Sequence, residues 1–253
     1  MLNIIKYDLK GNFKELLIII GSIIFLNIIL ITRINALPKE GIIGFSIMIT
    51  SIASIIIFLF NINLLSKDIY SDNSYLLFTL PERGYSILTA KLITAIIQFF
   101  IVFGIASIFN FIYIIKLGDT LMLLTLREIF NFRNIFFSVI ICMLFNIEFL
   151  THVFFSITAS KMALKKNKLG KLGAFGIFVA ISLITGKISM QLEEKIPKEI
   201  SLTIFSKQNY FTNVNFPDLK LNLASLIFEI FIFIFIILYI GTCYILENKM
   251  DLN

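Results

Sequence analysis

The feature that most constrains this chain is its succession of long apolar segments. Crossing a membrane takes a helix of roughly 20 apolar residues, and six segments approach or exceed that length: about 16–34, 42–65, 92–115, 135–159, 172–189 and 223–246. Only 15% of the 253 residues are charged, whereas a soluble domain carries roughly 25%. The sequence therefore predicts an all-α integral membrane protein, with six transmembrane helices in a single domain spanning residues 1–253.

The distribution of basic residues predicts the orientation of these spans. An even number of spans leaves both termini on one side of the membrane. Five lysines fall within Lys161–Lys171 without an acidic residue among them, and such a short basic loop stays in the cytoplasm. The lysines of Lys187–Lys220 are spread through a long outer loop, about 190–222, and long loops count little in this rule. We therefore expect both termini in the cytoplasm.

The first residues predict an interfacial amphipathic helix at about 2–13. Its apolar residues recur at three- and four-residue spacing, namely Leu2, Ile5, Leu9 and Phe13. Its charged residues fall largely on the other side, namely Lys6, Asp8, Lys10 and Lys14. This pattern is typical of a helix that lies in the membrane interface and turns into the first span near Gly11–Asn12. The alternative is a cytoplasmic extension of that span.

A polar interruption at Ser66–Lys91 separates the second and third apolar segments. Ser71, Asp72 and Asn73 are good helix N-caps, and Pro81 ends the short apolar run that follows them. Ser86 is expected to begin the helix of the third span. A short cytoplasmic helix that displays Tyr75 and Phe78 is typical of a docking surface for a partner. The alternative is a turn that folds back onto the inner leaflet.

The sequence offers little that could carry catalysis. It contains no Walker A motif for binding nucleotide phosphates. His152 is the only histidine, which excludes zinc sites built from paired histidines. The basic residues cluster at the ends of apolar segments, so nucleic acid is not an expected partner. We expect a non-catalytic chain that binds no cofactor and no metal of its own.

Two acidic residues, Glu148 and Glu229, and the single histidine, His152, lie inside the predicted spans. Ionisable groups in hydrocarbon are costly, so they face protein or water. Glu148 and His152 are four residues apart and share a helical face. They form either a polar spot on a substrate pathway or a contact between helices, and the second is the commoner role for such groups.

The interruption also carries a resemblance to a known family. It reads KDIYSDNSYLLFTLPERGYSILTAKL between the second and third spans. This resembles the permease subunits of ABC-2-type exporters of Gram-positive bacteria. Their loop at this place is a coupling helix, with a Tyr-Leu-rich helix, then Leu-Pro, a small polar turn and a lysine that opens the third helix. The corresponding residues in this chain are Tyr75, Leu76, Leu80, Pro81, Ser86 and Lys91.

The resemblance implies a multi-pass subunit in the bacterial plasma membrane. Two permeases, identical or paralogous, would pair and dock on a separate ATPase subunit that binds ATP and Mg²⁺. The residues expected at that docking surface are Asp72, Tyr75, Leu76, Phe78, Leu80, Pro81 and Arg83. The exported substrate would be an amphiphile such as an antimicrobial peptide or a drug, and export would confer resistance to it.

Two other functions stay open on the residues alone. The chain could be a membrane sensor or scaffold that docks a cytoplasmic partner without transport. It could also be an intramembrane enzyme that uses Glu148 and His152.

Overall fold

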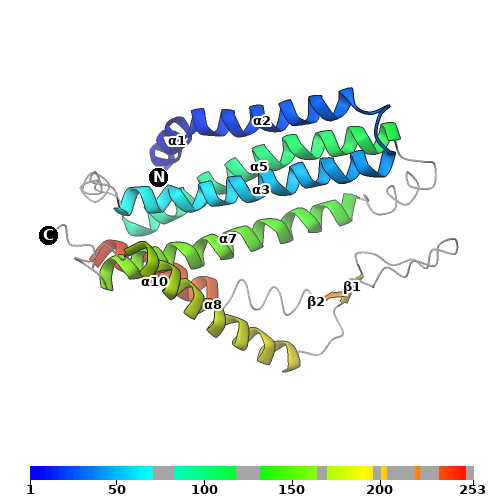
Figure 1. Cartoon of the computed structure of the whole chain (residues 1–253). Helices are drawn as coiled ribbons and strands as arrows, with labels where there is room; N and C mark the ends of the chain where they lie inside the picture. The colour runs from blue at the N-terminus through cyan, green and yellow to red at the C-terminus, as the bar shows by residue number, and fades with distance from the viewer. Residues whose placement is uncertain are drawn as a thin grey trace.

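The computed structural model describes residues 1–70, 83–117, 132–163, 170–195, 201–203, 220–222 and 234–248. Within these ranges the chain forms seven helices and one pair of short strands (Figure 1). The helices are α1 (Leu2–Gly11), α2 (Phe13–Thr32), α3 (Lys39–Tyr70), α5 (Gly84–Leu117), α7 (Phe132–Ala163), α8 (Gly170–Lys195) and α10 (Phe235–Asn248).

Four helical segments are long and apolar enough to cross a membrane: Phe13–Thr32, Gly41–Tyr70, Gly84–Leu117 and Val139–Met162. They correspond to the first four predicted spans. Two shorter apolar helical segments, Leu172–Ile188 and Phe235–Glu247, lie in the fifth and sixth predicted spans. The first part of the sixth predicted span, 223–233, lies outside the described residues. The predicted membrane character is therefore confirmed by these apolar helices.

The helices α3 and α5 are longer than a membrane requires. They contain 32 and 34 residues, which makes each roughly 50 Å long at about 1.5 Å per residue. The hydrocarbon core of a bilayer is only about 30 Å thick. Both helices therefore continue into the polar interruption, where 66–70 ends α3 and 84–91 begins α5.

The start of α5 differs from the prediction by two residues. The helix begins at Gly84 rather than at Ser86. The carbonyl oxygen of Arg83 accepts hydrogen bonds from the backbone N–H groups of Ser86 and Ile87, at 2.9 and 3.3 Å. Gly84 N–H is held by a side chain of α10, the Glu247 carboxylate, at 2.8 Å. This distant partner stabilises the first turn of α5.

The amphipathic N-terminal segment forms α1, and a break at Asn12 separates it from α2. The two helices run in different directions (Figure 1). The predicted division of faces is wrong for Asp8, which points into the bundle and pairs with Lys91 of α5. Of the apolar face only Ile5 is buried, whereas Leu2 and Phe13 are exposed.

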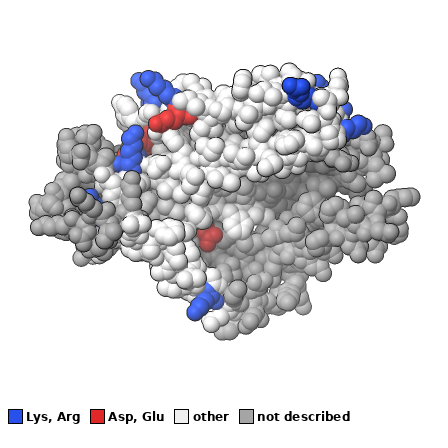
Figure 2. Space-filling view, in the orientation of Figure 1, with Lys and Arg blue, Asp and Glu red and all other residues white. Residues whose placement is uncertain are grey.

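The core consists of two clusters of buried apolar side chains. One lies between α2, α3 and α5 and includes Ile23, Ile57 and Val102. The other lies between α3, α5, α7, α8 and α10 and includes Leu65 and Phe154. A largely uncharged surface lies between charged groups near the two ends of the molecule, with an acidic group near the middle of the view (Figure 2). An apolar surface of this kind suits lipid as solvent.

The predicted outer loop 190–222 begins inside a helix, because α8 continues to Lys195. Farther along, β1 (Ser201–Thr203) pairs with β2 (Lys220–Asn222) in antiparallel register, and Ser201 lies opposite Asn222. Residues 196–200 and 204–219 lie outside the described part of the chain.

Candidate functional site

Polar groups join six helices at the end of the molecule where α3 stops and α5 starts, on the left in Figure 1. We call these groups the polar junction. Its members are Asp8 of α1, Asp68 and Tyr70 of α3, Gly84 and Lys91 of α5, Ser160 of α7, Gly170 of α8 and Glu247 of α10. The largely apolar cluster of α3, α5, α7, α8 and α10 packs directly beside it.

The centre of the polar junction is an ion triad around Lys91. The Lys91 side chain is only 2% exposed. Its Nζ lies 2.8 Å from Oδ1 of Asp8 and also pairs with Oδ2 of Asp68. A buried ammonium is stable only when it is paired and hydrogen-bonded. One lysine of α5 therefore holds α1 and the end of α3 together.

The triad has one cation for two carboxylates, and this imbalance affects the pKa of Asp8. Burial raises the pKa of the Asp8 carboxyl above its ordinary value. The nearby Lys91 ammonium opposes that rise in pKa by favouring the charged form, while repulsion from Asp68 adds to it. The second oxygen of Asp8, Oδ2, is buried and has no hydrogen-bond partner among the described residues. Asp8 therefore takes up a proton more readily than an exposed aspartate does.

Two further polar contacts close the junction. The Gly170 carbonyl oxygen accepts hydrogen bonds from the hydroxyls of Tyr70, at 3.0 Å, and Ser160, at 2.6 Å. This contact joins α3, α7 and α8. Gly84 N–H donates to Oε1 of Glu247 at 2.8 Å, which joins α5 to α10. The junction therefore ties the ends of α3 and α5 to most of the bundle.

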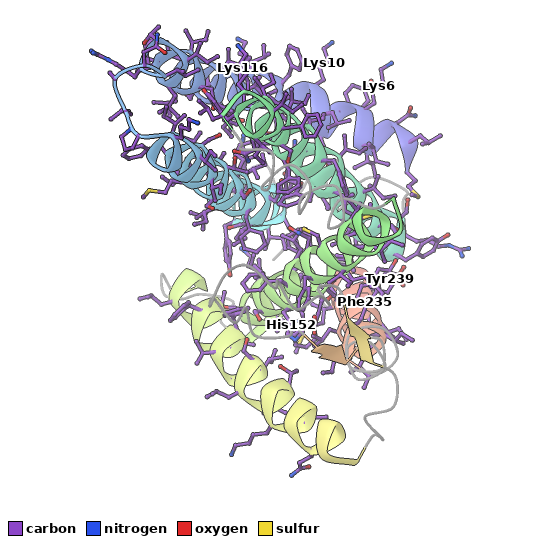
Figure 3. The ribbon with its side chains drawn as sticks, turned by 90° about the vertical axis from the view of Figure 1, so that its right-hand side faces the viewer. Lys6, Lys10, Lys116, His152, Phe235 and Tyr239 are labelled. Atoms are coloured by element: carbon purple, nitrogen blue, oxygen red, sulfur yellow. The ribbon has the colours of Figure 1, made fainter. Side chains whose placement is uncertain are left out.

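A groove of about 840 Å³ opens beside the triad, between the α1–α2 turn and the end of α3. Its polar lining includes Asp8, Glu15, Lys67, Asp68 and Lys91. Lys6 and Lys10 of α1 extend outward from the bundle (Figure 3) and are not among the residues that line the groove. The triad therefore borders a polar recess at the edge of the bundle.

The predicted pair Glu148 and His152 lies at a second site, near the middle of α7. Both residues line a pocket of about 410 Å³ between α3, α7 and α8. His152 lies on the side of α7 that faces α8 (Figure 3). The remaining lining residues are Phe58, Phe145, Asn146, Phe149, Phe178, Ser182 and Thr185. We call this cavity the α7–α8 pocket.

The hydrogen bond of the His152 ring defines which nitrogen can face a ligand. Its Nδ1 lies 2.9 Å from the backbone carbonyl oxygen of Glu148. A carbonyl oxygen only accepts hydrogen bonds, so Nδ1 carries the proton. In the neutral ring Nε2 is then the acceptor. The imidazole is 6% exposed, so its orientation is set by packing as well as by this bond.

Aromatic rings from three helices form one wall of the α7–α8 pocket. The rings of Phe58 and Phe149 meet edge to face, with centroids 4.7 Å apart. Phe149 and Phe178 lie at a tilt, with centroids 5.3 Å apart. Rings in such arrangements stabilise one another beyond simple burial. The pocket therefore combines a carboxyl group, an imidazole and two hydroxyl groups with a wall of phenyl rings.

The structure places few of the predicted docking residues. Arg83 is described and is exposed, directly before α5. The other predicted docking residues lie outside the described residues: Asp72, Tyr75, Leu76, Phe78, Leu80 and Pro81. Glu229 of the sixth predicted span also lies outside them. Among the residues that are described, no group of three or more His, Cys, Asp or Glu side chains could hold a metal ion.

Reasoning from the sequence missed the ion triad and the partners that α8 contributes to the pocket. Lys91 was assigned only to the start of the third helix. It is one of two charged residues in α5, with Lys116 at the far end. A lysine flanked by apolar residues needs an acidic partner, and Asp68 is the nearest acid at the end of the preceding helix. No comparable sequence signal indicates Asp8.

Comparison of the chain with known protein families, curated proteins and solved structures found no match. Any functional conclusion therefore depends on its residues and their geometry.

Proposed function

We propose that this chain is the permease subunit of an ATP-driven ABC exporter of the ABC-2 type in the bacterial plasma membrane. In this proposal it has six spans and both termini in the cytoplasm, and it pairs with a second permease, identical or paralogous. A separate ATPase subunit binds ATP and Mg²⁺. The exported molecule is an amphiphile, such as an antimicrobial peptide or a drug.

The observation that carries the proposal is the attachment to the polar junction of the two helix ends that flank residues 71–82, at Tyr70 of α3 and Gly84 of α5. This segment connects α3 to α5, and it contains the residues that resemble a coupling helix. The helix ends on either side of it are joined to each other and to α1 through Lys91. Glu247 and Gly170 continue these contacts to α10 and α8. A displacement of 71–82 therefore reaches several helices at once.

The attachment suits the transmission of force from an ATPase. ATP can drive transport only if it favours one of two conformations through different contacts. Closure of the ATPase dimer would push on 71–82, and the long helices α3 and α5 would carry the motion through the membrane as rigid rods. Packed interfaces tend to switch between discrete arrangements rather than bend continuously.

Affinity purification in mild detergent tests the proposal. The tagged chain should co-purify from its native membranes with a protein that carries a Walker A motif. Leu76→Asp combined with Phe78→Asp should abolish this association, because two charged side chains would replace apolar contact residues. Leu2→Asp combined with Tyr7→Asp is the matched control. It makes a leucine-to-Asp and an aromatic-to-Asp exchange at exposed positions of α1 and should leave the association intact.

Two results would contradict the proposal. One is the absence of any nucleotide-binding subunit among the co-purified proteins, which would favour a sensor or scaffold. The other is an activity that needs no ATP and is lost in Glu148→Gln, which would favour an intramembrane enzyme.

A further inference from the structure

The α7–α8 pocket has a chemical character that the export proposal does not specify. It lies between α3, α7 and α8 near the middle of α7, and none of its lining residues belongs to the polar junction. Its polar groups come from two helices, since Glu148 and His152 belong to α7 and Ser182 and Thr185 to α8. The helix α3 contributes only a phenyl ring, that of Phe58. A ligand held there would contact all three helices.

The polar groups of the pocket favour a cation that carries N–H bonds. A carboxylate at membrane depth is stabilised by a paired positive charge. His152 Nε2 is available only as an acceptor in the neutral ring, because Nδ1 donates to the Glu148 carbonyl oxygen. The hydroxyl groups of Ser182 and Thr185 also have lone pairs that accept hydrogen bonds. An ammonium group supplies both the charge and the donors that these groups can accept.

The apolar wall of the pocket also favours a cation. Phe58, Phe149 and Phe178 form a continuous aromatic surface. The faces of such rings attract a nearby ammonium through their quadrupoles. Phe145 and Phe149 are 46% and 40% exposed on the surface of the bundle, so the pocket borders the region that lipid would occupy. An alkyl chain attached to the ammonium would therefore stay in an apolar environment.

We propose that the α7–α8 pocket binds amphiphiles that carry a primary or secondary ammonium group, with Glu148 as the counter-ion and Phe178 as part of the aromatic wall. The inference rests on the proposed function in one respect, since it names the substrate class of that exporter. Binding itself requires neither ATP nor the ATPase subunit. The two proposals can therefore fail separately.

The test measures binding of radiolabelled dodecylamine to the full chain in phosphatidylcholine nanodiscs, with empty nanodiscs subtracted. We expect saturable binding of the amine and weaker binding of dodecanol, which has the same chain without the charge. Glu148→Gln should weaken amine binding about tenfold or more, because it removes a charge-assisted contact. Phe178→Leu should weaken it about threefold and leave dodecanol unchanged. Size-exclusion profiles and thermal unfolding establish that each variant is folded.

Glu15→Gln is the control for charge. It removes a carboxylate that lines the separate groove beside the junction and should not alter amine binding. Phosphatidylethanolamine added to the nanodiscs distinguishes the sources of the ammonium group. If this lipid competes with dodecylamine, the pocket binds a lipid headgroup. If it does not compete, the pocket binds a free amphiphile. The inference is overturned if folded Glu148→Gln binds dodecylamine as tightly as the natural chain, or if dodecanol binds equally well.

Discussion

At the scale of single residues, Lys91 is the side chain on which most of the polar junction depends. Removing one partner of a buried ion pair leaves an uncompensated charge, whereas replacing the whole group by neutral side chains is often tolerated. Asp8 and Asp68 are 18% and 29% exposed, so water reaches both carboxylates in part. The cost of losing Lys91 should therefore lie below that of a fully buried pair.

Lys91→Met should destabilise the chain by about 2 kcal/mol, because two neighbouring carboxylates then lack their cation. Adding Asp8→Asn and Asp68→Asn to Lys91→Met should recover most of this loss, since no charge is then left unpaired. Unfolding in a fixed detergent mixture measures both effects. Lys67→Met, at an exposed position of α3, should change stability little. A triple variant no more stable than Lys91→Met would show that the lysine acts through packing instead.

Two polar sites differ in how far the sequence could predict them. Glu148 and His152 are four residues apart, and helical periodicity alone places them on one face. Asp8 and Lys91 are 83 positions apart, and no local sequence pattern predicts a contact between residues so far apart. The helical moment of the N-terminal segment even directed Asp8 to the wrong face. At Asp8 the ion pair with Lys91 of α5, rather than the amphipathic pattern, determines where the side chain lies.

At the scale of elements, the start of α5 shows how one helix fixes the boundary of another. The Glu247 carboxylate of α10 accepts the hydrogen bond from Gly84 N–H, and a carboxylate also interacts favourably with a helix N-terminus. This contact requires a close approach. A Cβ at Gly84 would lie 2.8 Å from the carbonyl oxygen of Cys243. Glycine is therefore needed at this position because of a neighbouring backbone.

Gly84→Ala should destabilise the chain by about 1–3 kcal/mol, since the added methyl group must displace the backbone of α10. Gly104→Ala makes the same exchange in the same helix, where nothing lies within 4 Å of the new Cβ. It should be neutral or slightly stabilising because alanine favours helices. Thermal unfolding of the two variants in one detergent compares them. Equal midpoints would exclude a tight α5–α10 contact.

The helices themselves were largely predictable, whereas several of their ends were not. Hydropathy locates the part of a helix that lies in lipid, and it loses its signal where the helix enters water. The second predicted span stopped at residue 65, but α3 continues to Tyr70. Tyr70 is held there by its hydrogen bond to Gly170 of α8. A contact between distant segments thus extends a helix beyond its apolar part.

At the scale of the whole molecule, polar contacts have different roles at its two ends. The junction joins six helices beside the segment 71–82. At the opposite end Asn110 bridges Ser46 and Thr50, and the Tyr113 hydroxyl donates to the Asn27 carbonyl oxygen at 2.8 Å. Among the described residues, these contacts connect only α2, α3 and α5. A push on the junction would therefore reach six helices, whereas the contacts named at the opposite end join α2, α3 and α5.

This mechanism requires the polar junction to lie in the cytoplasm, which labelling of single cysteines tests. Cys142 and Cys243 are first replaced by serine. Leu2→Cys and Leu37→Cys then place a thiol at the two ends of α1–α2, at positions 80% and 37% exposed. In intact cells a membrane-impermeant maleimide should label Leu37→Cys and not Leu2→Cys, and permeabilised cells should label both. A cysteine added after Asn253 should behave like Leu2→Cys if the number of spans is even. Labelling of Leu2→Cys in intact cells would place the junction outside, where no cytoplasmic ATPase could reach it.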